Sequence, residues 1–204
     1  IRNKLSSSKI RWQMKDTKIR TWWRFWASAY DYKKFEADLD ELKKFYQDEG
    51  YRDFTILSDT VYYEPNKKGL VVKIDLEEGN KYKYRNFTWE GNSLYETEIL
   101  DETLNLNIGD GYSKSVFEEA VYQNVQSLYM DRGYLYSSIE PSFTPAGDDS
   151  LDVHFSITEN NQVYIRNINI YGNDKTRENV IRRELDVFPG DLFRRTLMMR
   201  SMQK

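Results

Sequence analysis

The stretch KYKYRNFTWEGNSLYETEILDETLNLNIGDGY, residues 81–112, recurs as QVYIRNINIYGNDKTRENVIRRELDVFPGDLF, residues 162–193. Arg85 corresponds to Arg166 and Gly109 to Gly190, and both pairs give one offset (166 − 85 = 81; 190 − 109 = 81) without a gap. Apolar positions between the identities also correspond. A fixed period of this length is typical of a tandem array of small modules.

The middle module, residues 80–160, is the complete one, and its first half is predicted from residues 82–107. Residues 82–90 alternate around aromatic side chains, which predicts a strand, and Gly91-Asn92 predicts the turn that ends it. Ser93 and Glu96 match the capping-box pattern, so a helix is expected to begin there.

The second half is predicted from residues 111–157. Ser115 and Glu118 give a second capping-box match, and the helix that follows is expected to end at Gly133. This helix is expected to present one apolar face, formed by Val116, Ala120, Val121, Val125, Leu128 and Tyr129. Strands are predicted at residues 134–143 and, from strict alternation, at 151–157. The predicted order is β-α-α-β-β.

The N-terminal region has the signature of the back half of a similar module. An apolar face at Phe35, Leu39, Leu42 and Phe45 predicts a helix, which ends in YQDEGY where the complete module has YMDRGY. A hairpin follows, with strands at residues 61–63 and 70–74. The first helix of this unit is expected within residues 6–25.

The repeat divides the chain into units at residues 1–79, 80–160 and 161–204. The first unit is expected to lack its leading strand, and the last to be truncated in its second helix. The fold class expected is α+β, with a three-stranded sheet covered by two helices in the complete unit.

Composition narrows the possible functions. The 204 residues include no cysteine and one histidine, and the formal net charge is −3. Because there is no cysteine, disulfides and thiolate metal sites are excluded. Because the net charge is slightly negative, the protein as a whole has no positive electrostatic field that would attract nucleic acid. No apolar run reaches the ~18 residues that span a bilayer. No cofactor, metal or catalytic residue is expected.

Other motifs have ordinary structural explanations. His154 alternates with apolar neighbours, so it is expected to face solvent. The tryptophans interleaved with arginines at residues 11–26 could stack nucleobases, but packing is favoured. The loop Gly109-Asp110-Gly111 lacks the lysine of a P-loop and the ligands of an EF-hand. It also lacks the GXXG of a KH domain, and a helix-to-helix turn explains it.

Taken together, the repeated motifs resemble a known family. The Gly-Asn after the first strand, the Gly-Asp between helices and Tyr-x-Asp-x-Gly-Tyr are similar to POTRA domains, and VIRREL…PGDLF resembles the POTRA arrays of BamA-type assembly factors of the Omp85 superfamily. RNFTWEGNSLY and FYQDEGYRD resemble versions from Bacteroidetes-like bacteria.

The resemblance implies a location and a set of partners. It implies the periplasmic side of the bacterial outer membrane, in a parent protein embedded through a barrel that is absent from this chain. It also implies a role in folding and inserting outer-membrane proteins. The expected partners are unfolded outer-membrane proteins, accessory assembly lipoproteins and periplasmic chaperones, with no nucleic acid.

Sheet physics suggests how such clients are bound. Edge strands present unpaired N–H and C=O groups, and an unfolded client consists of extended segments that need such partners. The candidate binding edge of the middle unit is residues 137–143, and that of the front unit residues 55–63. Replacing Ile139 by proline is expected to weaken crosslinking and leave the fold intact. The candidate residues are Ser137, Ser138, Ile139, Glu140, Ser142, Phe143, Thr55, Ile56, Thr60, Val61, Tyr62 and Tyr63.

Three alternatives stay open at this point. One is the POTRA region of another Omp85-type secretion or translocation transporter, or of a division-site scaffold. A second is an enzyme, for which a deep pocket shared by carboxylates would be needed. A third is nucleic-acid binding, which would show a strong dependence on salt.

Overall fold

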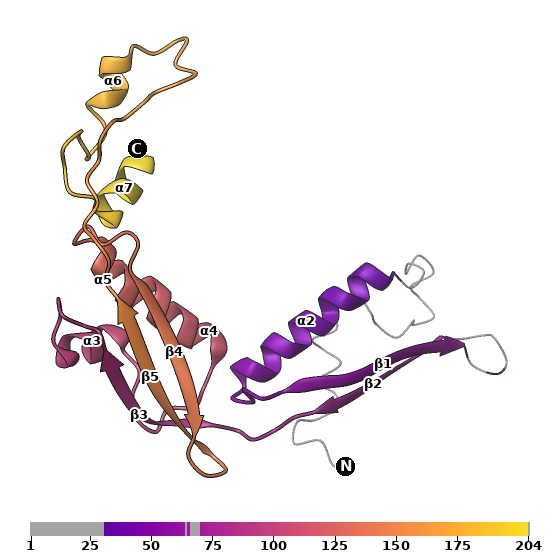
Figure 1. Cartoon of the computed structure of the whole chain (residues 1–204). Helices are drawn as coiled ribbons and strands as arrows, with labels where there is room; N and C mark the ends of the chain where they lie inside the picture. Colours follow the sequence, from indigo (N-terminus) through magenta and orange to yellow (C-terminus); the bar gives the residue numbers. More distant parts are fainter. Residues whose placement is uncertain (1–30, 64, 66–69, 204) are drawn as a thin grey trace. The chain divides into compact units, whose positions relative to one another are not determined.

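A computed structural model describes residues 31–63, 65 and 70–203 (Figure 1). The predictions for the helix within residues 6–25, for the leading strand of the first unit and for Trp12, Trp22, Trp23 and Trp26 lie outside these residues. In chain order, the elements are α2 (Tyr32–Asp48), β1 (Thr55–Tyr63), β2 (Leu70–Glu77), β3 (Lys83–Glu90), α3 (Thr97–Leu104), α4 (Lys114–Glu118), the π-helix η1 (Glu119–Val125), α5 (Gln126–Met130), β4 (Ser138–Pro145), β5 (Ser150–Thr158), α6 (Glu178–Arg182) and α7 (Arg195–Met202).

The chain folds into two compact units. The first comprises the described residues up to Arg85, together with Ile108–Val116 and Pro145–Leu151. The second comprises Asn86–Asn107, Phe117–Thr144 and the described residues from Asp152 onward.

In the first unit, helix α2 packs against the antiparallel hairpin β1–β2, as predicted. The buried cluster is aromatic at its centre, and the rings of Tyr46 and Phe54 stack with centroids 4.0 Å apart. Ile56 of β1 and Leu76 of β2 pack against this cluster. Ile56 and Leu76 are also register partners, so together they mark the face of the hairpin that packs against the helix.

The complete module contains a three-stranded sheet in the order β3-β5-β4. The central strand β5 confirms the predicted alternation, since Leu151, Val153, Phe155 and Ile157 are all buried. The ring of Trp89 in β3 stacks on Phe155 with a centroid distance of 4.1 Å. Alternation works here because successive side chains of a strand point to opposite faces of the sheet.

The second helix of this module matches the predicted apolar face in part. Ala120, Val121, Val125 and Tyr129 are buried as predicted, whereas Val116 is exposed and Leu128 is half-buried. Phe117 is buried as well, and with Val121, Val125 and Tyr129 it forms a row at a constant spacing of four. In an α-helix each such step overshoots a full turn by about 40°, so the row would wind away from the core. The wider turn of the π-helix η1 compensates for this drift.

Both capping-box predictions are wrong. Helix α3 begins at Thr97, and Ser93 lies before it with its hydroxyl donating to the carboxylate of Glu159. Ser115 lies inside α4, and its amide donates to Asp48. In both places the acceptor comes from a distant part of the chain, so a local sequence pattern could not identify it.

The second copy of the repeated stretch is less regular than the first. Tyr164 forms an isolated bridge with Leu192, but residues 165–171 belong to no strand. In the complete module β3 is held by β5, and the described residues beyond 171 contain no strand that could play this part. Tyr171 is accordingly 86% exposed.

Candidate partner-binding strand edges

The candidate edge of the complete module lies on β4. Ser138, Ile139, Glu140, Ser142 and Phe143 belong to this strand, and Ser137 immediately precedes it. Within the described residues β5 is the one strand that pairs with β4, so β4 forms a margin of the sheet.

The side chains of β4 are divided between two environments. Ser137 and Ile139 are buried, whereas Glu140 and Ser142 are exposed on the outer face. The ring of Phe143 packs against Phe117, with centroids 5.0 Å apart. Proline at Ile139 would therefore also remove a core side chain, so the expectation that it leaves the fold intact is not supported.

We infer the register of β4 from one backbone and one side-chain hydrogen bond. The amide of Ala146 donates to the carbonyl of Ser150, and the hydroxyl of Ser142 donates to the carbonyl of His154. These pairs place even-numbered residues opposite partners on β5. Because backbone groups alternate in direction along an antiparallel strand, the odd-numbered residues direct their N–H and C=O groups to the open side.

Two of these outward positions are prolines. Pro141 and Pro145 have no N–H to offer, so the open side of β4 presents a row of carbonyls but amide donors only at Ile139 and Phe143. Proline is tolerated here because an edge strand needs no donor on that side. The open edge of β4 therefore has more hydrogen-bond acceptors than donors to offer an added strand.

The candidate edge of the first unit is β1. Its predicted residues Thr55, Ile56, Thr60, Val61, Tyr62 and Tyr63 all lie in the strand, which contains no proline. Among the described residues β1 pairs with β2 alone, with a bulge at Leu57, where the register shifts. Tyr62 and Tyr63 are 48% and 68% exposed, so the far end of this strand offers aromatic surface as well as backbone.

The outer face of the hairpin carries a small polar network. Asp75 accepts hydrogen bonds from Lys73 Nζ at 2.7 Å and from Ser58 Oγ at 2.9 Å. The bond from Lys73 lowers the pKa of Asp75, and that of Ser58 adds to the effect. Both ionised groups are solvated, so this pair contributes little to stability and keeps the hairpin surface hydrophilic.

His154 lies on the outer face of the three-stranded sheet, as predicted. Its ring nitrogens lie 2.9 Å from Thr88 Oγ1 and 3.3 Å from Glu90 Oε2, and 44% of the side chain is exposed. Among the described residues no group of three histidine or carboxylate side chains could hold a metal ion.

The strongest pKa shifts belong to core tyrosines. Burial raises the pKa of Tyr84 and of Tyr129 well above the ordinary value, because it disfavours the charged phenolate. Burial also raises the pKa of Tyr46, whose hydroxyl donates to Glu78 at 3.0 Å. These phenols stay neutral, so they act as packing groups with polar ends.

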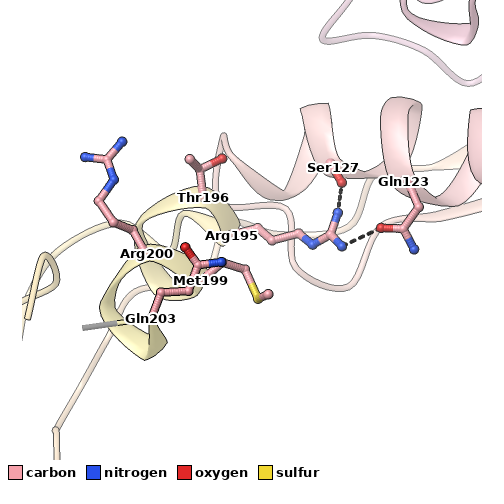
Figure 2. A pocket seen from close by; sticks show the side chains of 7 residues that line it. All are labelled: Gln123, Ser127, Arg195, Thr196, Met199, Arg200 and Gln203. Carbon is pink, nitrogen blue, oxygen red and sulfur yellow. Dashed lines mark hydrogen bonds between the residues drawn. The ribbon is translucent and has the colours of Figure 1, made fainter.

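A hollow of about 450 Å³ lies beside the start of α7 (Figure 2). The guanidinium of Arg195 donates to Gln123 at 2.6 Å and to Ser127. The residues that line this hollow include no carboxylate and no histidine, so they offer no groups for acid–base chemistry. The lining residues are Gln123, Ser127, Arg195, Thr196, Met199, Arg200 and Gln203.

Pro145 lies four residues after Pro141 on the same open side of β4, and its position there was not predicted. The length of the hairpin loop decides whether the odd- or the even-numbered residues of β4 point their backbone groups outward. Pro145 could have been identified from the sequence only if that length had been known. No helix among the described residues has both the length and the apolar character needed to cross a bilayer.

Comparison with known proteins identifies the fold. The family model for POTRA, described as surface antigen variable number repeat, matches residues 2–79, 82–160 and 163–204. The crystal structure of Haemophilus influenzae BamA POTRA3-5 superposes with a TM-score of 0.74 at 22% identity, covering 97% of this chain and 78% of that chain. The expected α+β fold of tandem POTRA modules is therefore confirmed.

Similar sequences belong to one type of protein. The outer membrane protein assembly factor BamA of Neisseria meningitidis serogroup B is 29% identical over 203 residues, which are 98% of this chain and 25% of that protein. BamA of Neorickettsia risticii is 30% identical over 171 residues, 82% of this chain and 22% of that protein. This chain thus spans about a quarter of their length. These relatives are named as outer membrane protein assembly factors. The chain belongs to the POTRA family, as a POTRA region of the BamA type.

Proposed function

We propose that this chain serves outer-membrane protein assembly by binding extended segments of unfolded outer-membrane proteins along the open edges of β1 and β4. The observation that carries this proposal is that each strand has one paired and one unpaired side among the described residues. An added strand would gain main-chain hydrogen bonds with little demand on its sequence, which suits a protein with many clients.

The two edges would contribute differently. The β1 edge has no proline and ends in exposed tyrosines, so it can both donate and accept hydrogen bonds. The β4 edge offers mainly carbonyls, because Pro141 and Pro145 occupy outward positions. A client would therefore pair more fully with β1, while β4 would favour short or transient pairing.

The similarity to BamA proteins supports the wider setting. It supports a location on the periplasmic side of the outer membrane, with accessory assembly lipoproteins and periplasmic chaperones as further partners. Units at residues 1–79, 80–160 and 161–204 are part of the same proposal, which the three matches to the POTRA model support.

Photo-crosslinking tests the edge-binding proposal. A photoreactive phenylalanine analogue would replace Thr60 on β1, Ser142 on β4 or Ser156 on the central strand β5, and an unfolded outer-membrane protein would be diluted from urea into each variant. All three positions carry small, exposed polar residues, so the three substitutions are expected to change the stability of the fold to a similar extent. Only the first two lie on edge strands.

The expected result is crosslinking at Thr60 and Ser142 that exceeds the yield at Ser156 several-fold, with Thr60 the stronger. Equal yields at all three positions would mean that clients contact the outer face of the sheet without preference for its margins. That outcome would remove the basis of the proposal.

A further inference from the structure

The aspartate of the motif Tyr-x-Asp-x-Gly-Tyr makes a long-range hydrogen bond that the sequence pattern does not predict. In its first copy, Asp48 Oδ1 accepts a hydrogen bond from the backbone amide of Ser115 at 2.8 Å and from the hydroxyl of Ser113 at 3.2 Å. Asp48 precedes Ser115 by 67 residues, yet both belong to the first compact unit. Ser115 is the second residue of α4.

The second copy of the motif repeats this contact. Asp131 Oδ1 accepts from the backbone amide of Thr196 at 2.7 Å, and its other oxygen accepts from the threonine hydroxyl. Thr196 is the second residue of α7, and both residues belong to the second compact unit. The flanking residue Arg194 makes no side-chain cap bond to this helix. Figure 2 shows Thr196 next to Arg195, whose guanidinium reaches back to Ser127 and Gln123.

A backbone hydrogen bond accompanies each carboxylate. The carbonyl of Gly50 accepts from the amide of Tyr82 at 3.0 Å, and the carbonyl of Gly133 accepts from the amide of Val163 at 2.8 Å. Gly133 also has a φ of +88°, and a Cβ placed on it would lie 2.5 Å from Leu192 Cδ1. In both copies of the motif, the aspartate and the glycine therefore each accept a hydrogen bond from a segment that comes later in the chain.

The chemistry at the helix start explains the aspartate. The first amides of a helix have no partner within it, and a carboxylate there is favoured both as an acceptor and by the helix dipole. We propose that the aspartate of Tyr-x-Asp-x-Gly-Tyr is a capping latch: it ties the end of one helix to the start of the second helix of the next repeat, at Asp48 and again at Asp131.

Site-resolved hydrogen exchange of the 204-residue chain tests this proposal, using Asp48→Ala and Asp131→Ala. Asp48→Ala is expected to speed exchange of the Ser115 amide about fivefold, the typical effect of a lost cap, while the Thr196 amide keeps its rate. Asp131→Ala is expected to give the reverse pattern. Each variant thus serves as the control for the other.

Two further measurements separate a local latch from general destabilisation. Asp148→Ala removes an exposed carboxylate from a hairpin turn and is expected to leave both amides unchanged. The buried amide of Phe155 reports on global unfolding. If Ser115 in Asp48→Ala accelerates no more than Phe155 does, or not at all, the latch is refuted.

Discussion

The open edge of β4 allows a gain-of-binding prediction. Replacing Pro141 and Pro145 together by threonine would add two outward N–H donors to an edge that now has donors only at Ile139 and Phe143. Each added main-chain hydrogen bond contributes about 0.5–1.5 kcal/mol net. The double variant should therefore bind an extended peptide from an outer-membrane protein strand about 5-fold to 150-fold more tightly.

The assay is fluorescence anisotropy with a labelled peptide of about ten residues, together with sedimentation velocity of the variant. Sedimentation is needed because an edge that gains donors can also pair with a second copy of itself. The matched control is Ser142→Thr, which introduces the same residue type at an even-numbered position, whose backbone groups face β5 in the register inferred above. It is expected to leave the affinity unchanged.

Removing proline also carries a stability effect that must be measured. Each replacement raises the entropy of the unfolded chain and costs about 0.4–1 kcal/mol, which thermal unfolding would detect. If the double variant folds, and neither its affinity nor its self-association changes more than about twofold, then the outward assignment of these two positions is wrong. The account of a donor-poor β4 edge would then fail.

Three further predictions concern stability. Phe155→Ala removes a fully buried ring that stacks on Trp89, and it should lower the free energy of unfolding by about 3–5 kcal/mol in urea titration. Gly91→Ala places a Cβ 2.1 Å from the carbonyl oxygen of Ile157 at a φ of +82°, so it should destabilise the chain by more than about 1 kcal/mol, whereas alanine at Gly147, with open space around it, should cost less. Burial acts to raise the pKa of Asp48, but the hydrogen bonds from Ser115 and Ser113 and the charge of Lys114 outweigh it and lower the pKa. The stability from this lowered pKa is present above the ordinary aspartate value and should be lost as pH falls through the pKa of the folded state, which the Ser115 amide shift would follow.

Much of the architecture is predictable from this sequence because the relevant signals are local and periodic. Strict alternation over residues 151–157 requires only that neighbouring side chains of a strand point to opposite faces, and β5 follows it. The repeat at an offset of 81 residues requires only that similar modules need similar turns. The segments named as candidate edges lie in β1 and β4, which are margins of the described sheets, and client binding at these margins stays a prediction.

The remaining features depend on groups that meet only after folding. Ser93 and Ser115 look like local helix caps, but their partners are Glu159 and Asp48, 66 and 67 residues away in the chain. The exposure of Val116 and the burial of Phe117 were not predicted, because a π-helical segment changes the phase of a helix and no local pattern in the sequence indicates it. Periodicity along the chain thus determined which elements form, whereas the tertiary structure alone decided which distant groups satisfy their free ends, because a hydrogen bond depends on distance in space and not on separation in sequence.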